Sequence, residues 1–576
     1  MKVADFIALF LEKKGVKHVF ELSGGMITHL LDSLNQKTAI NIISMHHEQA
    51  AAFAADASGR ITGVPGIAMA TSGPGATNLL TGIGSCYFDS SPAIFITGQV
   101  NRHEQKGDRP IRQLGFQETD IVSMAAPITK ACFLINNPED IPAIFERAFA
   151  IATEGRPGPV LIDIPMDVQR SQIDVSAEAL ETPASNDTAA GSGQFAQLIA
   201  DIRLAKRPVI LAGRGIKSAF ATSLLLELAE KLNIPVVTTL LAVDAIPFDH
   251  PLRIGFIGSY GNRWANIAFG ESDFILVLGS RLDIRQTGAD TRFFENRKIY
   301  HVDCVAGEIN NRIKGCIPIV QDVTLFMNNF LTACKTETFT KVQDWFDYVA
   351  DLKDKWPDIK ELNVLENTIN PNIFVHALST ASSPAKAYLA DVGAHQMWAA
   401  QSLELNETQL FLTSAGMGAM GFALPASIGA SLAFDRQPVV VIIGDGCMQL
   451  NIQELQTIVR NKLPVKIVVM NNQNLGMIRQ FQESYFESRY QSTYWGYTAP
   501  DFEKIAIAYG INGKTISRPE EVAAAVDWLW NEENKAAPVV LQVMIDPHTN
   551  TYPKIAFGKP ITEMEPFAKP IEMEGT

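Results

Sequence analysis

Short apolar runs alternate with longer segments of helical periodicity along the whole chain. Among these runs are VPGIAMATSG, SPAIFITGQ, RPVILAG, DFILVLGS, QPVVVIIGDG and PVKIVVMNN. Strands that are apolar on both faces are typical of parallel sheets covered by helices on both sides. The first helix is predicted by apolar residues at Val3, Phe6, Ile7, Phe10 and Leu11. We therefore predict an α/β protein whose ligands bind beyond the carboxyl ends of its strands.

Two polar segments divide the chain into three parts of similar size. Residues 171–194 are rich in small residues, and residues 344–370 are rich in charge, so we interpret both as linkers. The tail is proline-rich and lacks a period, so it is either an ordered lid over an active site or a loose end. We predict three doubly wound parallel-sheet domains at residues 1–170, 190–335 and 365–550, followed by the tail at 551–576.

Composition narrows the class of partner. The formal net charge of -14 argues against a nucleic-acid or anionic-membrane surface, because phosphate binding needs clustered Lys and Arg. Six cysteines lack CxxC spacing, which predicts reduced thiols with neither a zinc site nor disulfides. No apolar run reaches membrane-spanning length. We expect a soluble, cytoplasmic protein with small-molecule partners.

Two apolar runs in the third part end on oxygen-bearing side chains. Gly444-Asp445-Gly446 follows the first run, and Asn471-Asn472 follows the second after 24 intervening residues. That length suits one crossover helix, and a right-handed crossover brings both strand ends to the same sheet edge. Mg²⁺ takes carboxylate and amide oxygens, and glycine lets a phosphate approach closely. Either motif alone is more often a turn, but the two together favour a site.

This pair of motifs resembles the diphosphate anchor of thiamine diphosphate (ThDP) enzymes. The resemblance implies that Asp445, the side chain of Asn472 and the backbone carbonyl of Asn474 bind Mg²⁺. It also implies that Gly444 and Gly446 contact the cofactor. A ThDP enzyme further requires an acid at the other end of the cofactor, supplied by a different part of the chain.

Glu48 is the candidate for that acid. It follows the strand-like run INIISM and opens an alanine-rich helix. A hydrogen bond from an acid to the pyrimidine ring promotes the tautomer that removes the C2 proton of the thiazolium. Taken alone, an acid in a first helical turn more often complements the helix dipole. His46 and His47 precede it, and we interpret both as structural because neighbours on a strand point to opposite faces.

Five motifs extend the resemblance from the first domain to the last. They are TSGPGATNLLTGIGSCYFDSSPAIFITGQV, GFQETDI, GRPGPVLIDIPMDV, TSAGMGAMGFALPASIGA and NNQNLGMIRQFQESYFESRY. Together they resemble the acetohydroxyacid (acetolactate) synthase branch of the ThDP decarboxylases, which have pyrimidine, central and diphosphate domains. In that family Glu48 and Asp445 would meet across the interface of a homodimer, and two dimers would associate.

Further residues match family positions around ThDP. Met420 matches the apolar residue that holds the cofactor bent, although alone it would be an ordinary core methionine. Gly25 and Gln117 match positions close to the reacting carbon. Gly418 and Met477 match other cofactor-binding positions.

The central part carries a signal for a second cofactor. LVLGSRLDIRQTGA resembles the flavin-binding segment of the synthases, whereas the glycine turn in LAGRGIKS is a weak signal by itself. The alternative is a central domain of the same shape without a cofactor. A redox role for the flavin would instead indicate a pyruvate oxidase-like enzyme. The resemblance assigns FAD to Gly213, Arg281, Asp283 and Arg285, and to Asp303 and Asp322 at the adenosine and isoalloxazine ends.

Departures from the family pattern gather around the site for the acceptor substrate. Phe481 replaces a tryptophan, Ile284 replaces an acid, Met26 replaces a small residue, and Ser259 stands in a segment that differs. Arg285 matches the arginine that pairs with the acceptor carboxylate, a task that suits a planar bidentate donor.

We therefore predict a ThDP- and Mg²⁺-dependent carboligase. It would decarboxylate pyruvate and transfer the two-carbon unit to a carbonyl acceptor, most simply a second pyruvate, giving 2-acetolactate. One alternative is transfer to a non-standard acceptor such as a keto-sugar nucleotide. Another is a catalytically silent homologue or regulatory subunit, against which the presence of Glu48 weighs.

Overall fold

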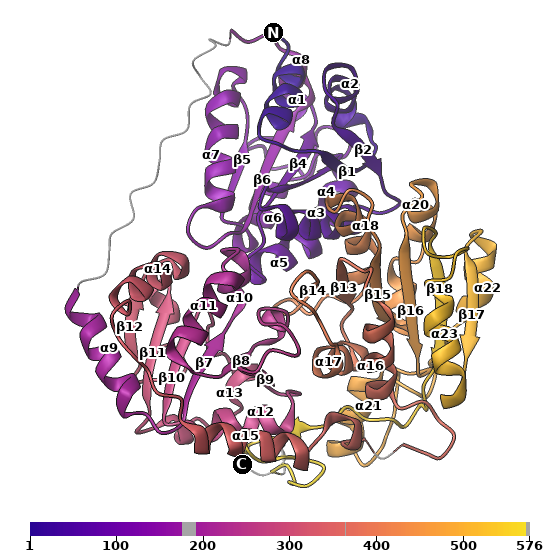
Figure 1. Ribbon diagram of the computed structural model, residues 1–576. Coiled ribbons are helices and arrows are strands. Elements are labelled where there is room, and N and C mark those ends of the chain that lie inside the picture. Colours follow the sequence, from indigo (N-terminus) through magenta and orange to yellow (C-terminus); the bar gives the residue numbers. More distant parts are fainter. Residues whose placement is uncertain (175–191, 363, 572–576) are drawn as a thin grey trace.

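The computed structural model describes residues 1–174, 192–362 and 364–571. Three α/β units follow one another along the chain, with the N-terminal unit at the top of Figure 1, the central unit at the lower left and the C-terminal unit at the right. Each contains a six-stranded parallel sheet flanked by helices, which confirms the predicted fold class. Within the described residues, no helix combines the length and apolarity needed to cross a membrane. All six cysteines are free.

The N-terminal sheet has the strand order β2-β1-β3-β4-β6-β5. Its strands are β1 (His18–Leu22), β2 (Asn41–Ser44), β3 (Gly66–Ala70), β4 (Ala93–Gln99), β5 (Ala131–Leu134) and β6 (Pro159–Pro165). Its helices are α1 (Val3–Lys13), α2 (Thr28–Lys37), α3 (Glu48–Thr62), α4 (Pro74–Asn78), α5 (Leu80–Phe88), α6 (Ile121–Ala125), α7 (Ile141–Thr153) and α8 (Met166–Arg170). The predicted N-terminal amphipathic helix is α1.

The central sheet has the strand order β12-β11-β10-β7-β8-β9. Its strands are β7 (Pro208–Ala212), β8 (Val236–Thr238), β9 (Arg253–Phe256), β10 (Phe274–Leu278), β11 (Lys298–Asp303) and β12 (Ile317–Val320). Its helices are α9 (Ser192–Leu204), α10 (Arg214–Ser218), α11 (Thr222–Leu232), α12 (Arg263–Glu271), α13 (Ile284–Thr287), α14 (Val323–Ala333) and α15 (Gln343–Lys355).

The C-terminal sheet has the strand order β14-β13-β15-β16-β18-β17. Its strands are β13 (Ala387–Ala390), β14 (Leu410–Thr413), β15 (Val439–Gly444), β16 (Val465–Asn471), β17 (Asn512–Ile516) and β18 (Val539–Met544). Its helices are α16 (Pro371–Ala381), α17 (Ala394–Ser402), α18 (Ala423–Ala433), α19 (Asp445–Leu450), α20 (Glu454–Arg460), α21 (Gly476–Tyr485), α22 (Phe502–Ala508) and α23 (Val522–Trp528). The tail forms a small hairpin of β19 (Lys554–Ile555) and β20 (Met564–Glu565).

Near the middle of each sheet, the strands on the two sides are added in opposite directions. The reversals lie between β1 and β3, between β7 and β10, and between β13 and β15. At such a point the two following loops leave in opposite directions, and the crevice between them is the usual ligand site of an open parallel sheet. The fold therefore offers one crevice in each unit.

Helices α3 and α18 join the N-terminal and C-terminal units. They pack so closely that a Cβ on Gly429 would lie 2.0 Å from the carbonyl oxygen of Ala54. Beside them the buried guanidinium of Arg60 pairs with Asp56 at 2.6 Å and Asp89 at 3.1 Å. It also donates to the carbonyl of Thr413 at 2.8 Å. Tight packing and a paired buried charge hold these two units together.

Only one of the two predicted linkers can be compared with the structure over most of its length. Most of residues 171–194 lies outside the described residues. The segment 344–370 is not simply a linker, because α15 buries Trp345, Val349 and Leu352 in an apolar cluster of the central unit. The tail adds Ile561 and Met564 to the same cluster. Residues 551–571 are therefore ordered and anchored to the central unit.

The connection between the two motif-bearing strands also differs in detail. Instead of one crossover helix, two short helices follow β15, and the first of them begins at Asp445 itself. The strands β15 and β16 are nevertheless parallel neighbours, as predicted, with Gly444 opposite Met470. Both motifs therefore leave the sheet at the same edge.

Candidate active site

The predicted metal ligands converge at the ends of β15 and β16. Asp445 and Asn472 are both buried. One atom of the Asn472 side-chain amide lies 2.8 Å from the carbonyl oxygen of Asn474 and 3.2 Å from Oδ1 of Asp445. An amide nitrogen there would donate to both oxygens, whereas an amide oxygen would complete a set of three oxygens facing one another. Such a set fits Mg²⁺, which prefers oxygen ligands.

A tyrosine and a methionine adjoin these oxygens. The hydroxyl of Tyr497 donates to Oδ2 of Asp445 at 3.0 Å, and burial raises the pKa of that carboxyl to about 6. A Cβ on Gly446 would lie 3.2 Å from the Tyr497 hydroxyl and 3.5 Å from Cε of Met420. Met420 and Gly446 thus lie beside the metal-type ligands, where the sequence places them, whereas Tyr497 is an addition from the structure.

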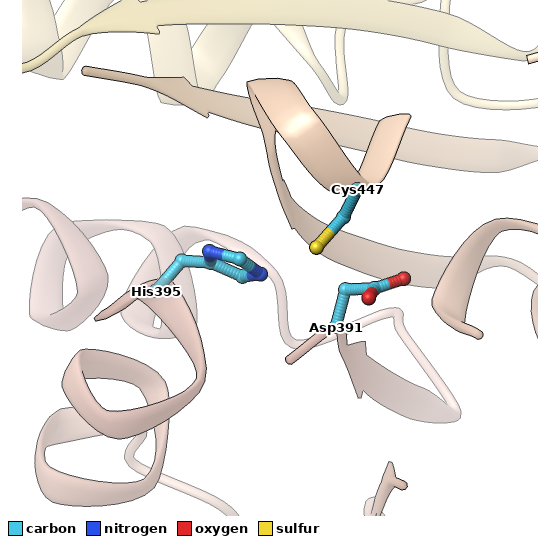
Figure 2. A group of neighbouring side chains, drawn as sticks. All are labelled: Asp391, His395 and Cys447. Carbon is cyan, nitrogen blue, oxygen red and sulfur yellow. The ribbon is translucent and has the colours of Figure 1, made fainter. Parts of the chain in front are cut away.

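Asp391, His395 and Cys447 surround the crevice between β13 and β15. Figure 2 shows the three side chains facing one another, with one ligand-type atom of each within 4.8 Å of the others. Asp391 accepts three backbone N–H bonds at 2.7 to 2.9 Å, two of them from the turn after Met420. Burial lowers the pKa of His395 to about 3 and raises that of Cys447 well above its ordinary value. A thiol that keeps its proton suits support of this turn better than a metal site, because a cysteine binds a metal as the thiolate.

Glu48 begins α3, and the residue is only 6% exposed. Its Oε2 accepts a hydrogen bond from the side-chain amide of Asn78 at 2.9 Å. A Cβ on Gly75 would lie 3.2 Å from Oε1, so the second oxygen faces the turn that follows β3. His47 caps α3 by accepting from the backbone N–H of Gln49 at 3.0 Å, which supports its structural interpretation although it lies outside a strand.

The other predicted residues of the N-terminal unit surround the same turn. The backbone N–H of Met26 donates to the hydroxyl of Thr71 at 3.2 Å. A Cβ on Gly73 would lie 3.0 Å from Cβ of Gln117, whose φ is +66°. A Cβ on Gly25 would meet no atom within 4 Å, so open space adjoins that residue. The turn therefore gathers these residues at the crevice between β1 and β3.

A buried carboxylate tethers the loop that carries Gln117. Asp163, at the end of β6, accepts from the Thr97 hydroxyl at 2.7 Å and from the Gln99 amide at 2.9 Å. Gln99 also donates to the carbonyl of Thr119 at 2.7 Å. Burial raises the pKa of Asp163 to about 7. The position of Gln117 thus depends on a carboxyl group that is distant in the sequence.

A cavity of about 1460 Å³ lies between the three units. Most of the residues predicted to contact FAD line it, and Gly213 closes against its wall, where a Cβ would lie 2.3 Å from the carbonyl oxygen of Gly279. Neither Glu48 nor Asp445 lines this cavity. The predicted residues that do line it are Ser259, Arg281, Asp283, Ile284, Arg285, Asp303, Asp322 and Gly418.

Asp303 and Asp322 lie together rather than at opposite ends of the cavity. Asp303 ends β11, Asp322 follows β12, and the backbone N–H of the intervening Gln321 donates to the Asp303 carbonyl at 3.1 Å. Neighbouring parallel strands end at the same edge, so the same part of a bound flavin would meet both residues. The expectation that they meet the adenosine and isoalloxazine ends of a flavin stays a prediction, and the structure adds that the two residues lie at the ends of adjacent strands.

The residues predicted for the acceptor divide into two groups. Ser259, Ile284 and Arg285 line the cavity, and the backbone N–H of Ser259 donates to the carbonyl of Arg285 at 2.6 Å. Phe481 lies outside its lining, on α21, where it is 37% exposed and contacts Tyr485 with ring centroids 4.8 Å apart. Met26 belongs to the N-terminal crevice. The sulfur of Met477 accepts a hydrogen bond from the Thr551 hydroxyl at 3.7 Å, at the start of the tail.

Comparison with known proteins agrees with this three-part architecture. Residues 1–124 match the thiamine pyrophosphate enzyme N-terminal TPP binding domain, residues 195–330 its central domain, and residues 391–543 its C-terminal TPP binding domain. The crevices described above lie within these three stretches.

Similar proteins match the chain over nearly its full length. The probable acetolactate synthase large subunit of Methanocaldococcus jannaschii is 38% identical, covering 100% of this chain and 96% of that protein. The acetolactate synthase isozyme 1 large subunit of Escherichia coli is 36% identical, covering 97% of each. The acetolactate synthase large subunit of Lactococcus lactis is 35% identical, covering 96% of this chain and 94% of that protein. The chain therefore belongs to the thiamine pyrophosphate enzymes, within the family of acetolactate synthase large subunits.

Proposed function

We propose that the protein is an acetolactate synthase, which decarboxylates pyruvate and transfers the two-carbon unit to a second pyruvate to give 2-acetolactate. The relatives that share its full length carry that name, which supports this reaction over a silent homologue or a different acceptor. The observation in the structure that carries the proposal is the buried Glu48 carboxylate, whose Oε2 is held by Asn78 and whose Oε1 faces the turn after β3. Bound ThDP supplies the electron sink for decarboxylation.

The residues of the chain hold and orient the reactants. Glu48 would share a proton with the pyrimidine ring, and the amide of Asn78 fixes the direction of the carboxylate. The open space beside Gly25 leaves room for the substrate, and Gln117 offers an amide at the same crevice. Met420 would support the cofactor from the C-terminal unit.

The metal in this proposal is Mg²⁺. Asp445, the side chain of Asn472 and the carbonyl of Asn474 would hold it, because the Asn472 amide lies beside the other two oxygens and its own oxygen, turned toward them, completes a set of three. Removing a metal ligand should weaken cofactor binding. We expect Asp445→Ala to lower ThDP affinity, and unchanged affinity in a titration would remove Asp445 from the metal site.

The second cofactor in this proposal is FAD, in the cavity of the central unit. Its strand order corresponds to 3-2-1-4-5-6, the order of dinucleotide-binding sheets, which is an argument by analogy of fold. Arg214, Arg281 and Arg285 supply positive charge along the lining, which suits a diphosphate. Buried polar atoms of Ser218 and Gln321 lack partners among the described residues, as expected where a polar ligand belongs. We assign this flavin no net redox role.

The acceptor in this proposal is a 2-keto acid recognised by Arg285. Its guanidinium lines the cavity and forms none of the ion pairs found in the described part of the chain. Ile284, beside it, adds apolar surface that is 55% exposed. Phe481 contacts Tyr485 outside the cavity lining, and its role in selecting the size of the acceptor rests on the family resemblance.

We further propose a homodimer with active sites at the interface, and association of two dimers. Within one chain, Glu48 and Asp445 lie on different units and outside the shared cavity. Because the relatives are named large subunits, we also propose that a smaller regulatory subunit binds this chain.

The test is carbon-13 NMR of purified protein supplied with ThDP, Mg²⁺, FAD and labelled pyruvate. Rapid formation of labelled 2-acetolactate is the expected result. Slow release of acetaldehyde, with little acetolactate, would contradict the second-pyruvate acceptor and retain only decarboxylation. Unconsumed pyruvate in protein that binds ThDP would contradict the enzymatic function.

A further inference from the structure

One end of the large cavity holds a buried amide with no partner. Gln321 follows β12, the edge strand, and the residue is only 6% exposed while lining the cavity. Neither its Oε1 nor its Nε2 has a hydrogen-bond partner among the described residues. An unsatisfied buried amide destabilises a folded protein, so a ligand that paired with both atoms would remove that cost.

The neighbouring polar groups are already engaged within the protein. Asp322 caps α14 by accepting from two backbone N–H groups at 2.9 and 3.0 Å. Asp303 accepts from the backbone N–H of Val305 at 2.8 Å. Gln321 therefore differs from both carboxylates, because its donor and its acceptor are both free for a ligand.

The place of Gln321 along the sheet indicates which part of a dinucleotide it meets. From the switch point to the edge, the strands run β7, β10, β11 and β12. The cavity also reaches Met397 and Gly418 of the C-terminal unit, and Figure 1 shows β12 on the side of the central unit facing away from that unit. A dinucleotide whose flavin points toward the thiamine site therefore has its adenosine half at β12.

We propose that Gln321 recognises the adenine of the bound dinucleotide. Its amide oxygen accepts from the amino group on C6, and its amide nitrogen donates to the adjacent ring nitrogen. Glutamine suits this task because an amide and adenine carry matching pairs of donor and acceptor. The inference rests on the proposed FAD site and adds the residue that distinguishes the base.

The pyrimidine edge of the flavin ring also carries neighbouring donors and acceptors. If Gln321 paired with that edge, the dinucleotide would lie in the opposite orientation, with its flavin at β12. ADP contains only the adenosine half and FMN only the flavin half, so binding of each separates the two orientations.

The experiment measures FAD, FMN and ADP binding to flavin-free, full-length protein by equilibrium dialysis. Gln321→Met keeps the length of the side chain but removes the amide. We expect this substitution to lower the affinity for FAD and for ADP at least about tenfold, and to leave the affinity for FMN within about twofold of the wild-type value. The matched control, Gln286→Met, alters another glutamine of the same cavity and should leave ADP unchanged.

Thermal unfolding of the flavin-free protein separates recognition from structural support. Loss of an unsatisfied amide should leave the unfolding temperature of Gln321→Met equal to or above that of the wild type. Unchanged FAD affinity would overturn the inference. So would loss of FMN binding without loss of ADP binding, or equal losses in the control. Wild-type protein that bound ADP but not FAD would instead overturn the flavin assignment and retain base recognition.

Discussion

At the scale of single residues, the two oxygens of Glu48 have different surroundings. Asn78 holds Oε2 at 2.9 Å, while Oε1 faces the turn at Gly75. A carboxylate that could rotate freely would have to be ordered again when the cofactor binds. A hydrogen bond to one oxygen removes part of that freedom and leaves the other oxygen available.

Glu48→Gln tests the acid directly, since it keeps the shape of the side chain and removes its proton chemistry. We expect pyruvate decarboxylation to fall at least about 100-fold. ThDP should still bind with Mg²⁺, because the proposed metal ligands lie on another unit. Carbon-13 NMR measures decarboxylation, and a fluorescence titration measures cofactor binding. Undiminished turnover would remove Glu48 from the mechanism.

Asn78→Ala tests the orienting hydrogen bond. We expect exchange of the C2 proton of bound ThDP to slow about tenfold, the effect of one lost hydrogen bond to a charged group. Proton NMR in deuterium oxide measures this rate separately from later steps. Thr77→Ala, one residue away, is the control, and the C2 proton of ThDP bound to it should exchange at the wild-type rate. Equal rates in Asn78→Ala and the wild type would show that Glu48 needs no such support.

At the scale of elements, the sequence predicts the parts that depend on local pattern and chain handedness. Apolar runs predict strands, and the crossover rule brings Asp445 and Asn472 to one sheet edge. Other features depend on packing between distant segments. Tyr497 is 52 positions from Asp445, and Asp163 is 66 positions from Thr97. No periodic pattern in the sequence connects the members of either pair.

The prediction that residues 344–370 form a linker is wrong for a different reason. Trp345, Val349 and Leu352 have helical spacing, but charged residues surround them and lower the average hydrophobicity of the segment. Gln321 is likewise invisible in the sequence as a ligand group, because only the structure reveals that its amide is buried and unpaired. Asp391 could have been found, since it follows an apolar run and lies two residues before Gly393, a pattern close to that of Asp445 and Gly446.

The tether at the end of β6 predicts a dependence of stability on pH. Burial raises the pKa of Asp163 from 3.8 to about 7, with Asp120 adding a smaller unfavourable charge. Between these values the folded state binds the proton more tightly than the unfolded state does. The contribution of this group to stability is therefore greatest at low pH and is lost as pH rises from about 4 to about 7.

Asp163→Asn removes that titration and serves as the comparison. We expect the wild-type free energy of unfolding, relative to the variant, to fall by up to about 4 kcal/mol between pH 4 and pH 8. Urea unfolding of both proteins at several pH values measures the difference, and other titrating groups cancel in it. A difference that does not change with pH would contradict the raised pKa.

At the scale of the whole molecule, three sheets each contribute one switch-point crevice, but the proposed reaction needs groups from two of them at one cofactor. Glu48 lies at the N-terminal crevice and Asp445 at the C-terminal crevice. The close packing of α3 on α18 holds these units together, so hinge motion within a chain is an unfavourable way to bring the two groups together. A second copy of the chain can instead supply the missing half of each site.

Mixing two inactive variants tests this arrangement. In a mixed dimer of Glu48→Gln and Asp445→Ala chains, one interface site carries both substitutions and the other carries neither. Co-expression of equal amounts should therefore restore about a quarter of wild-type activity, because half of the dimers are mixed and each has one intact site. Each variant expressed alone is the control. Sites built within single chains would give no recovery, since every site would then carry one of the two substitutions.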